Sequence, residues 1–323
     1  MVRQDAGGGM RLIFCGTPHF AWPTLERLVR DRFGIELVMT NPDEPSGRGY
    51  QLKLSPVKEA ALQAGLPVFQ PQKLKSPFAR AFLSQYRPDA IVVVAYGHII
   101  PKWLIDLPRF GCINVHASLL PKYRGAAPIP WAIVRGEQTT GVTTMKIDTG
   151  LDTGDMLLER STEIRPDDTA ESLAERLSLM GADLLVETLT RLERGDIKPN
   201  PQDNAKATLA PLLKKEDGRI DWSLSAIEIE RRVRAFRPWP GAYTTFRAHG
   251  FQVWSAAVGL QAIPPADPGT LLADDHRLLV ACGGNTWLEL REVQFEGRRR
   301  VPAPDFLNGI RLGPQERLGT PAP

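Results

Sequence analysis

The chain has 323 residues, of which 42% are hydrophobic and 24% are charged. This composition is ordinary for a soluble globular protein, and the length suffices for two domains with a sizeable core. No apolar run approaches the roughly 18 residues that a membrane span requires, and we expect neither a membrane protein nor a secretory signal. Three isolated cysteines, without disulfide or metal-ligand spacing, fit a reducing compartment, and Cys15 and Cys112 fall in apolar runs typical of a core.

The net charge of +3 is unevenly placed. Residues 1–205 hold 24 Lys and Arg against 24 Asp and Glu, whereas residues 206–323 hold 16 against 13. An excess of this size is consistent with an anionic partner for the second half, and equally with an ordinary solvated surface.

The first half of the chain alternates between strand-like and helix-like segments. Residues 11–14 predict a first strand. Gly16, Thr17 and Pro18 then predict a turn, which leads into a helix over residues 22–31. The turn lacks the GxGxxG pattern, so a dinucleotide enzyme is disfavoured. Alternation predicts a parallel sheet with right-handed crossovers, with further strands at residues 35–40 and 90–95 and helices at residues 56–64 and 77–85.

Residues 113–155 hold the polar groups with the clearest chemical potential. Residues 111–115 predict a buried strand with Asn114 and His116 near its carboxyl end, where ligands bind in open α/β sheets. Their spacing of two places both side chains on one face of the strand. An amide that can hold an oxyanion and an imidazole that can move a proton suit attack by an amine on an acyl carbon. Each residue is also common in purely structural roles.

A carboxylate that orients the imidazole would complete such a site. The Gly-rich loop IDTGLDTGD offers Asp148, Asp152 and Asp155 after an apolar run at residues 140–147. Spacing alone does not decide among them, because loop aspartates commonly cap turns.

The second half of the chain has a different periodicity. Residues 169–194 predict a helix with an apolar stripe, and residues 198–213, rich in proline, predict a linker. A short basic helix over residues 225–236 then precedes five strand-like runs, which predict a small OB-like β-barrel. We therefore expect an α/β protein with a Rossmann-like domain at residues 1–205 and an OB-like domain at residues 206–323; the strand-like runs are residues 242–247, 251–257, 269–272, 277–281 and 287–295.

Several motifs in order along almost the whole chain resemble the folate-dependent formyltransferases. The motifs are MRLIFCGTPHFA from residue 10, NPDEPSGRG from residue 41, INVHASLLPKYRGAAPI from residue 113, GLDTGD from residue 150, RIDWSLSA from residue 219 and RAFRPWPGAY from residue 234. The resemblance implies a catalytic trio of Asn114, His116 and Asp152. It also implies a folate site at the start of SLLPKYRG, formed by Ser118, Leu119, Leu120 and Pro121.

The resemblance further implies transfer of a formyl group from 10-formyltetrahydrofolate to the α-amino group of methionine carried by initiator tRNA. No metal is required, and we expect a monomer in the bacterial cytoplasm. One alternative is a formyltransferase for a small amine, such as an amino-sugar nucleotide or glycinamide ribonucleotide. A second alternative, from another class, is a non-catalytic RNA-binding protein.

Arginines in two places are the candidates for tRNA binding. By resemblance, Arg48 lies in a loop that closes over the acceptor end of tRNA, although Tyr50 and Gln51 stand where the family often has lysines. Arg234 and Arg237 belong to a basic segment in which residues 231, 234 and 237 broadly share a helix face. That face predicts a sequence-independent grip on the RNA backbone, or a solvated surface paired with neighbouring glutamates.

Overall fold

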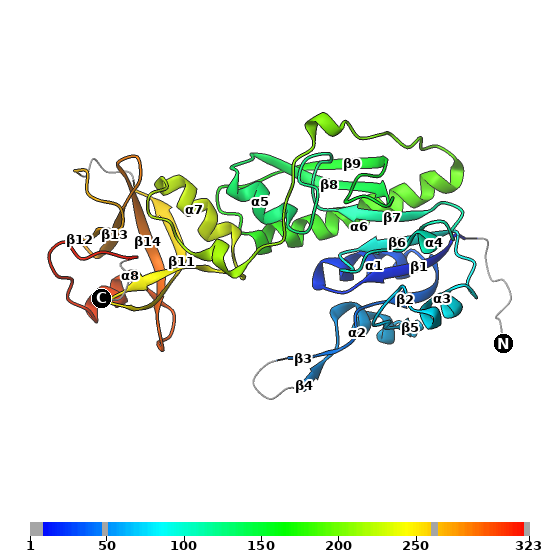
Figure 1. Ribbon diagram of the computed structural model, residues 1–323, viewed down its shortest axis with the longest axis horizontal. Coiled ribbons are helices and arrows are strands. Elements are labelled where there is room, and N and C mark those ends of the chain that lie inside the picture. The colour runs from blue at the N-terminus through cyan, green and yellow to red at the C-terminus, as the bar shows by residue number, and fades with distance from the viewer. Residues whose placement is uncertain (1–8, 47–50, 260–263, 320–323) are drawn as a thin grey trace. The chain divides into compact units, whose positions relative to one another are not determined.

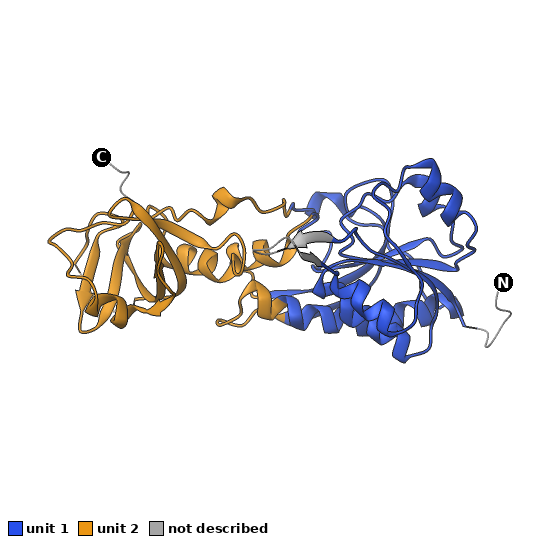
Figure 2. Cartoon of the chain, turned by 90° about the horizontal axis from the view of Figure 1, so that it is seen from below, with its two compact units in different colours: residues 1–125, 139–162, 174–209 blue, residues 126–138, 163–173, 210–323 orange. Residues whose placement is uncertain are grey.

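The computed structural model describes residues 9–46, 51–259 and 264–319. The chain forms two compact units, which Figure 2 distinguishes by colour. Unit 1 comprises residues 1–125, 139–162 and 174–209, and unit 2 comprises residues 126–138, 163–173 and 210–323. The predicted boundary after residue 205 is close to the last change of unit, at Leu209 and Ala210. As a division between catalytic and tRNA-binding functions it stays a prediction.

Unit 1 is built on a seven-stranded sheet with the strand order β5-β2-β1-β6-β7-β8-β9 (Figure 1). β1, β2, β5, β6 and β7 pair in parallel, as predicted, whereas β8 runs antiparallel to β7. The predicted fold class is therefore confirmed, with an antiparallel edge that the sequence did not indicate. The strands are β1 (Arg11–Gly16), β2 (Gly34–Met39), β5 (Val68–Phe69), β6 (Ala90–Val94), β7 (Cys112–His116), β8 (Thr139–Lys146) and β9 (Met156–Glu163).

Helices begin where proline and serine favour them. α2 and α3 each have a serine N-cap followed by proline, and the Oγ atoms of Ser55 and Ser76 each accept a backbone hydrogen bond of 3.1 Å. The helices of this half of the chain are α1 (Trp22–Arg30), α2 (Pro56–Gln63), α3 (Pro77–Leu83), α4 (Lys102–Ile105), α5 (Pro128–Val134) and α6 (Ala170–Arg194). A short hairpin, β3 (Glu44–Ser46) with β4 (Gln51–Lys53), lies between β2 and α2.

The two faces of β7 have different neighbours. α6 approaches Val115 closely, because a Cβ atom added to Gly181 would lie 2.8 Å from Cγ1 of that valine. Cys112, two residues before Asn114, joins a core cluster with Leu83 of α3 and Leu104 of α4 on the opposite face. Alternation along the strand therefore directs Asn114 and His116 away from α6.

Unit 2 contains an antiparallel sheet with the order β10-β11-β14-β13-β12, and β15 pairs with β14. Its core includes Phe246, Phe251 and Phe306, whose ring centroids lie 5.3 to 5.9 Å apart. All five predicted strands are present, with shifted ends. The elements are α7 (Ala226–Ala235), β10 (Ala242–Phe246), β11 (His249–Val258), β12 (Leu271–Asp274), β13 (Arg277–Cys282), β14 (Thr286–Phe295), β15 (Val301–Pro302) and α8 (Ala303–Asn308).

Unit 2 also contains α5, a helix from the first half of the chain. Trp131 of α5 packs edge to face against Phe236 at a centroid distance of 6.2 Å, and its Nε1 donates 2.8 Å to the carbonyl oxygen of Pro211. The basic helix ends at Ala235, one residue earlier than predicted, because Pro238 and Pro240 cannot continue it. Arg237 thus follows the helix.

Candidate active site

His116 is the best-defined polar group at the carboxyl end of β7. Its side chain is 6% exposed, and Nε2 lies 2.9 Å from the carbonyl oxygen of Tyr123. A carbonyl only accepts hydrogen bonds, so Nε2 carries a proton. Nδ1 faces Oδ2 of Asp152 at 3.7 Å, and it is the nitrogen that remains to take up a further proton.

The structure distinguishes the aspartates of the Gly-rich loop. Asp152 directs its carboxylate towards His116, and its Oδ2 accepts 2.8 Å from the backbone nitrogen of Gly125. Asp148 instead caps its own turn, accepting 2.9 Å from the backbone of Gly150 and 2.7 Å from Oγ1 of Thr153. Geometry therefore places Asp152, and not Asp148, beside the imidazole.

Asn114 lies on the same face of β7 as His116 and is half-buried. Its neighbours in the sheet are Val93 on β6 and Met145 on β8. Within the described part of the chain its side-chain amide makes no hydrogen bond, so both its donor and its acceptor are available to a ligand.

Residues 118–121 are fixed by contacts within unit 1. Ser118 is fully buried and its Oγ donates 2.7 Å to the carbonyl oxygen of Lys122. Oγ1 of Thr143 on β8 accepts a hydrogen bond of 3.1 Å from the backbone nitrogen of Leu120 and donates one of 2.7 Å to the carbonyl oxygen of Ser118. Leu119 and Pro121 are the half-exposed members of the segment, so a ligand would reach these two and the backbone.

Unpaired polar atoms lie in the segments that follow β2 and β6. Oδ1 of Asn41, Oη of Tyr96 and Nε2 of His98 are buried without a hydrogen-bond partner among the described residues. Burial raises the pKa of the Tyr96 phenol, which therefore stays protonated and able to donate. Because unpaired buried polar atoms are uncommon, these three mark places where a ligand would complete hydrogen bonds.

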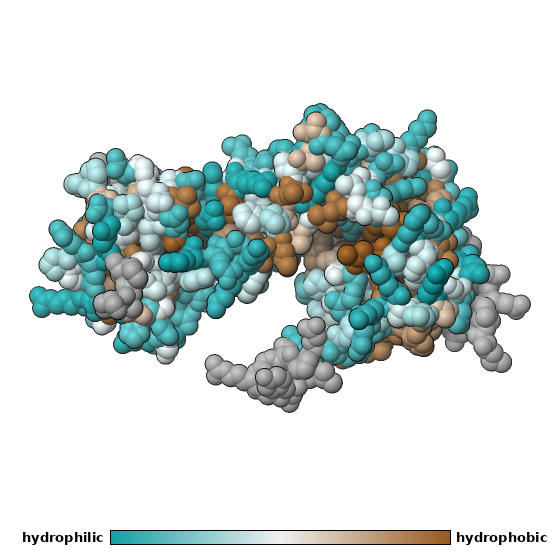
Figure 3. All heavy atoms as spheres, in the orientation of Figure 1, coloured by the Kyte–Doolittle hydropathy of each residue, from teal (hydrophilic) through white to brown (hydrophobic). Residues whose placement is uncertain are grey.

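Exposed apolar side chains lie next to His98 and next to Asp152. Ile99, beside His98, is 83% exposed, and Leu151, beside Asp152, is 61% exposed. On the face drawn in Figure 3, hydrophobic residues reach the surface over the central sheet of unit 1. A border of this kind suits a ligand with a flat ring or an apolar side chain.

The candidate tRNA-binding arginines have different settings. Arg48 lies outside the described residues. The side chain of Arg234 is 17% exposed. Its Nε donates a hydrogen bond of 2.6 Å to Glu230, and its Nη1 donates one of 2.5 Å to the carbonyl oxygen of Asp168. Arg237 is half-buried and donates 3.3 Å to the carbonyl of Trp254.

Both of these arginines line a groove of about 590 Å³ in unit 2. Three acidic residues share the groove with five arginines, so its lining carries a net positive charge of two (5 − 3). Arg231 and Arg234 of α7 and Arg237, which follows the helix, all line this groove; its other arginines are Arg165 and Arg291.

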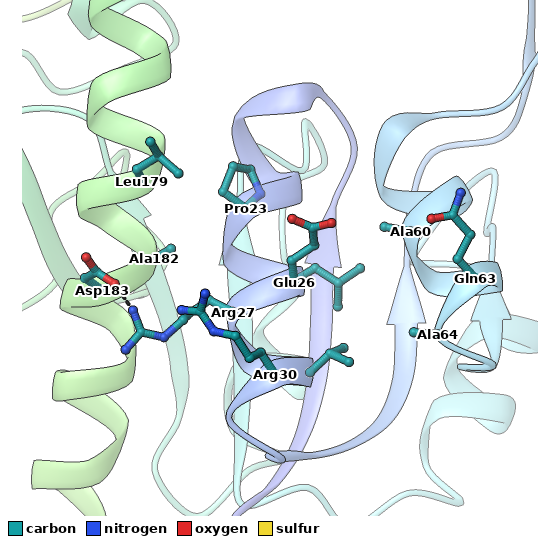
Figure 4. A pocket seen from close by; sticks show the side chains of 12 residues that line it. Pro23, Glu26, Arg27, Arg30, Ala60, Gln63, Ala64, Leu179, Ala182 and Asp183 are labelled. Atoms are coloured by element: carbon teal, nitrogen blue, oxygen red, sulfur yellow. Dashed lines mark hydrogen bonds and ion pairs between the residues drawn. The ribbon is translucent and has the colours of Figure 1, made fainter.

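A larger pocket, of about 730 Å³, lies between α1, α2 and α6 of unit 1 (Figure 4). Arg27 on α1 forms ion pairs with Asp31 and with Asp183 on α6. The lining contains neither Asn114 nor His116, and its paired charges give it no evident chemistry.

Among the described residues there is no cluster of three or more side chains able to hold a metal ion. The helices in the described ranges include none with the length and apolarity needed to cross a membrane.

An amide and an imidazole at the carboxyl end of β7, with a carboxylate beside the imidazole, fit a site of acyl-group transfer in a Rossmann-like domain. An antiparallel β domain follows it in the chain, so the class of protein is a two-domain acyl-group transferase. Comparison with known sequences narrows this class. The family described as formyl transferase matches residues 10–189, and the formyl transferase C-terminal domain matches residues 212–311. The chain belongs to the formyl transferase family.

Full-length relatives share about half of the residues. The chain is 58% identical over 311 residues to the methionyl-tRNA formyltransferase of Koribacter versatilis, covering 96% of this chain and 99% of that protein. It is 54% identical over 311 residues to the methionyl-tRNA formyltransferase of Acidobacterium capsulatum, covering 96% and 100%.

Solved structures support the fold. An N-formyltransferase from Helicobacter canadensis, in complex with folinic acid and dTDP-3-aminofucose, has a TM-score of 0.66 at 17% identity and covers 87% of this chain and 98% of that one. HypX from Aquifex aeolicus, in complex with tetrahydrofolic acid, has a TM-score of 0.60 at 19% identity and covers 93% and 47%.

Proposed function

We propose that this protein transfers the formyl group of 10-formyltetrahydrofolate to the α-amino group of methionyl initiator tRNA. The observation that carries the proposal is the grouping of Asn114, His116 and Asp152 in a chain that matches methionyl-tRNA formyltransferases over 96% of its length. The tetrahydrofolic acid bound to the HypX structure supports the folate donor.

The residues divide the chemistry of formyl transfer among them. An α-amino group titrates at about 7.7 to 8.0, so part of it is neutral and nucleophilic at physiological pH. As it attacks the formyl carbon, the unpaired amide of Asn114 donates to the developing oxyanion. Nδ1 of His116 takes the proton that the amine loses, and Asp152 at 3.7 Å stabilises the resulting imidazolium. The bond between the formyl carbon and the folate nitrogen then breaks, the imidazolium returns its proton to that nitrogen, and tetrahydrofolate leaves.

The folate donor would bind along residues 118–121 and the turn after β6. Ser118 and Leu120 are buried and hold the segment in place, while Leu119, Pro121 and backbone groups face a ligand. The unpartnered atoms of Tyr96 and His98 supply further hydrogen bonds for the polar edges of a pterin.

For tRNA, the groove of unit 2 provides cationic contacts to the phosphate backbone. Arg237 is the stronger candidate, because Arg234 already uses its guanidinium on Glu230 and Asp168. Arg48 remains a candidate from the sequence alone.

A small amine is the alternative acceptor, because solved relatives of the same fold include sugar N-formyltransferases. Their identity to this chain is 16% and 17%, whereas the methionyl-tRNA formyltransferases reach 54% and 58%. The higher identity favours the tRNA substrate, and an enzyme is favoured over a non-catalytic RNA-binding protein.

The test is a substrate comparison at equal concentrations of 10-formyltetrahydrofolate. Methionyl initiator tRNA, free methionine and a dTDP-amino sugar serve as acceptors, and the formylated products are separated chromatographically. We expect efficient formylation of the tRNA alone; preferred formylation of the sugar would overturn the proposal. The proposal also includes a monomeric state and a cytoplasmic location. Light scattering of the purified protein tests the monomeric state, and fractionation of cells tests the location.

A further inference from the structure

The side chain of Gln202 joins two parts of the candidate site. Its Oε1 accepts from Nε and Nη2 of Arg124, at 3.0 and 2.8 Å. Its Nε2 donates to the carbonyl oxygens of Asp152 and Gly154, at 2.9 and 2.7 Å. Both donors and both acceptor sites of the amide are therefore used.

A primary amide is the side-chain group that can do this. A carboxylate accepts but does not donate, and an ammonium donates but does not accept. Glutamine at position 202 therefore matches a site with a guanidinium on one side and two carbonyl oxygens on the other.

Asp152 needs external support in the conformation it adopts. Its φ of +52° lies in the left-handed region, which is unfavourable for a residue with a side chain. The loop closes tightly just after it, since a Cβ atom on Gly154 would lie 1.9 Å from the carbonyl oxygen of Lys146. Gln202 bonds the carbonyl groups on both sides of this bend.

Three successive residues, 123 to 125, each contact one of the residues His116, Gln202 and Asp152. The carbonyl of Tyr123 accepts from His116, the guanidinium of Arg124 donates to Gln202, and the backbone of Gly125 donates to Asp152. Arg124 is 7% exposed, and its guanidinium donates to the neutral amides of Gln202 and Asn204. Gln202 thus closes a ring of contacts around the imidazole and its carboxylate.

We propose that Gln202 is a positioning residue, which holds the backbone of Asp152 so that the carboxylate faces Nδ1 of His116. The proposal rests on the catalytic role of Asp152 in the proposed function. A residue of the segment after α6 thus helps to set the position of the Asp152 carboxylate.

Two substitutions separate the two sides of the amide. Gln202→Glu keeps an acceptor for Arg124 but removes both donors to the loop. Asn204→Ala is the matched control: it removes an acceptor 2.9 Å from Nη2 of the same guanidinium. Among the hydrogen bonds of the described residues, none joins Asn204 to Asp152. If position matters, Gln202→Glu lowers kcat for Met-tRNA formylation about 10 to 100-fold, as misplacement of a reacting group by about 1 Å does, and leaves both KM values within about twofold. Asn204→Ala keeps wild-type kcat.

Equal losses of kcat in the two variants, or a rise in KM in place of a fall in kcat, would mean that Gln202 acts through Arg124 or through general stability. Wild-type kcat in Gln202→Glu would equally overturn the proposal.

A second readout is independent of activity. The side-chain NMR signals of the five histidines, with His116 assigned through His116→Gln, are compared at one pH. We expect the His116 signal to move in Gln202→Glu and to stay in place in Asn204→Ala. If the wild-type protein fails to formylate Met-tRNA, the proposed function fails, and this signal alone decides whether Gln202 positions Asp152; an unmoved signal rejects it.

Discussion

Oδ2 of Asp152 lies 3.7 Å from Nδ1 of His116 and accepts its hydrogen bond from Gly125, 27 positions earlier in the chain (152 − 125). The carboxylate is thus fixed by backbone, and its distance from the imidazole leaves it to act mainly through charge.

Neutralising the charge of Asp152 should therefore lower turnover. Asp152→Asn preserves the size of the side chain and an oxygen for Gly125, and we expect turnover to fall by about 100-fold or more. Asp148→Asn, the control in the same loop, should stay within about threefold because Asp148 only caps a turn. Steady-state kinetics with Met-tRNA checks both. The reverse order of effects would reassign the carboxylate.

Asn114→Ala should lose turnover without losing stability. Removal of one oxyanion donor typically costs about 100 to 1000-fold in kcat. Because the Asn114 amide makes no hydrogen bond within the described residues, the melting temperature should change little. Turnover near that of the wild type would show that the amide faces no oxyanion.

Arg234 and Arg237 should have separable roles. Arg234→Ala removes the partner of the half-buried Glu230 and should lower the melting temperature. Arg237→Ala should leave folding intact, weaken tRNA binding, and flatten the dependence of log K on log salt by about 0.7 to 0.9, the effect of one phosphate contact. Filter binding at several salt concentrations measures this slope. An unchanged slope would place Arg237 outside the RNA interface.

The ion pair of Asp43 with Lys58 should contribute to stability over a defined pH range. Hydrogen bonds from Lys58 and Gln70 lower the pKa of Asp43 below its ordinary 3.8. A lowered pKa stabilises the folded state above the ordinary value, and this stability is lost as the pH falls through the folded pKa. Asp43→Asn should therefore reduce the free energy of unfolding by about 1 kcal/mol or less, equally from pH 5 to 8. The difference should disappear only in acid below about pH 4. Urea denaturation at stepped pH tests this, and a difference that already shrinks between pH 8 and 6 would point to another group.

The three thiols should be unreactive while the chain is folded. Cys15, Cys112 and Cys282 are at most 2% exposed, and burial raises their pKa values, to about 12 for Cys112 and Cys282. Since the thiolate is the nucleophile, iodoacetamide at pH 8 should modify none of them, and all three after unfolding in urea. Mass spectrometry counts the modified thiols; rapid labelling of the folded chain would show that it opens locally.

Local patterns in the sequence predicted most of the fold. The apolar runs of β1, β6 and β7 and the capped starts of α2 and α3 are set by neighbouring residues, and the predictions for them are confirmed. β9 was not predicted because half of its residues are exposed and its apolar and polar residues do not alternate. α5 was not predicted because its PIPWAIV run contains two prolines, which are unusual in a helix beyond its first turn.

The candidate site was less accessible to the same reasoning. Spacing placed Asn114 and His116 on one face, but the choice among three loop aspartates depends on contacts with Gly125 and Thr153 that no local pattern encodes. Gln202 gave no signal, because a single glutamine in a proline-rich segment resembles an ordinary linker residue. Its partners lie 78 and 50 positions away.

The membership of α5 in unit 2 affects how the protein is made. A ribosome that has synthesised residues 1–209 has completed every segment of unit 1, yet Trp131 is already present while its partners Pro211 and Phe236 are not. Domains generally fold as units during synthesis, and an apolar side chain waiting for its partner is exposed to aggregation. The nascent chain therefore passes through a stage at which Trp131 lacks both of these partners, and this interval ends only when Phe236, just after α7, has left the ribosome.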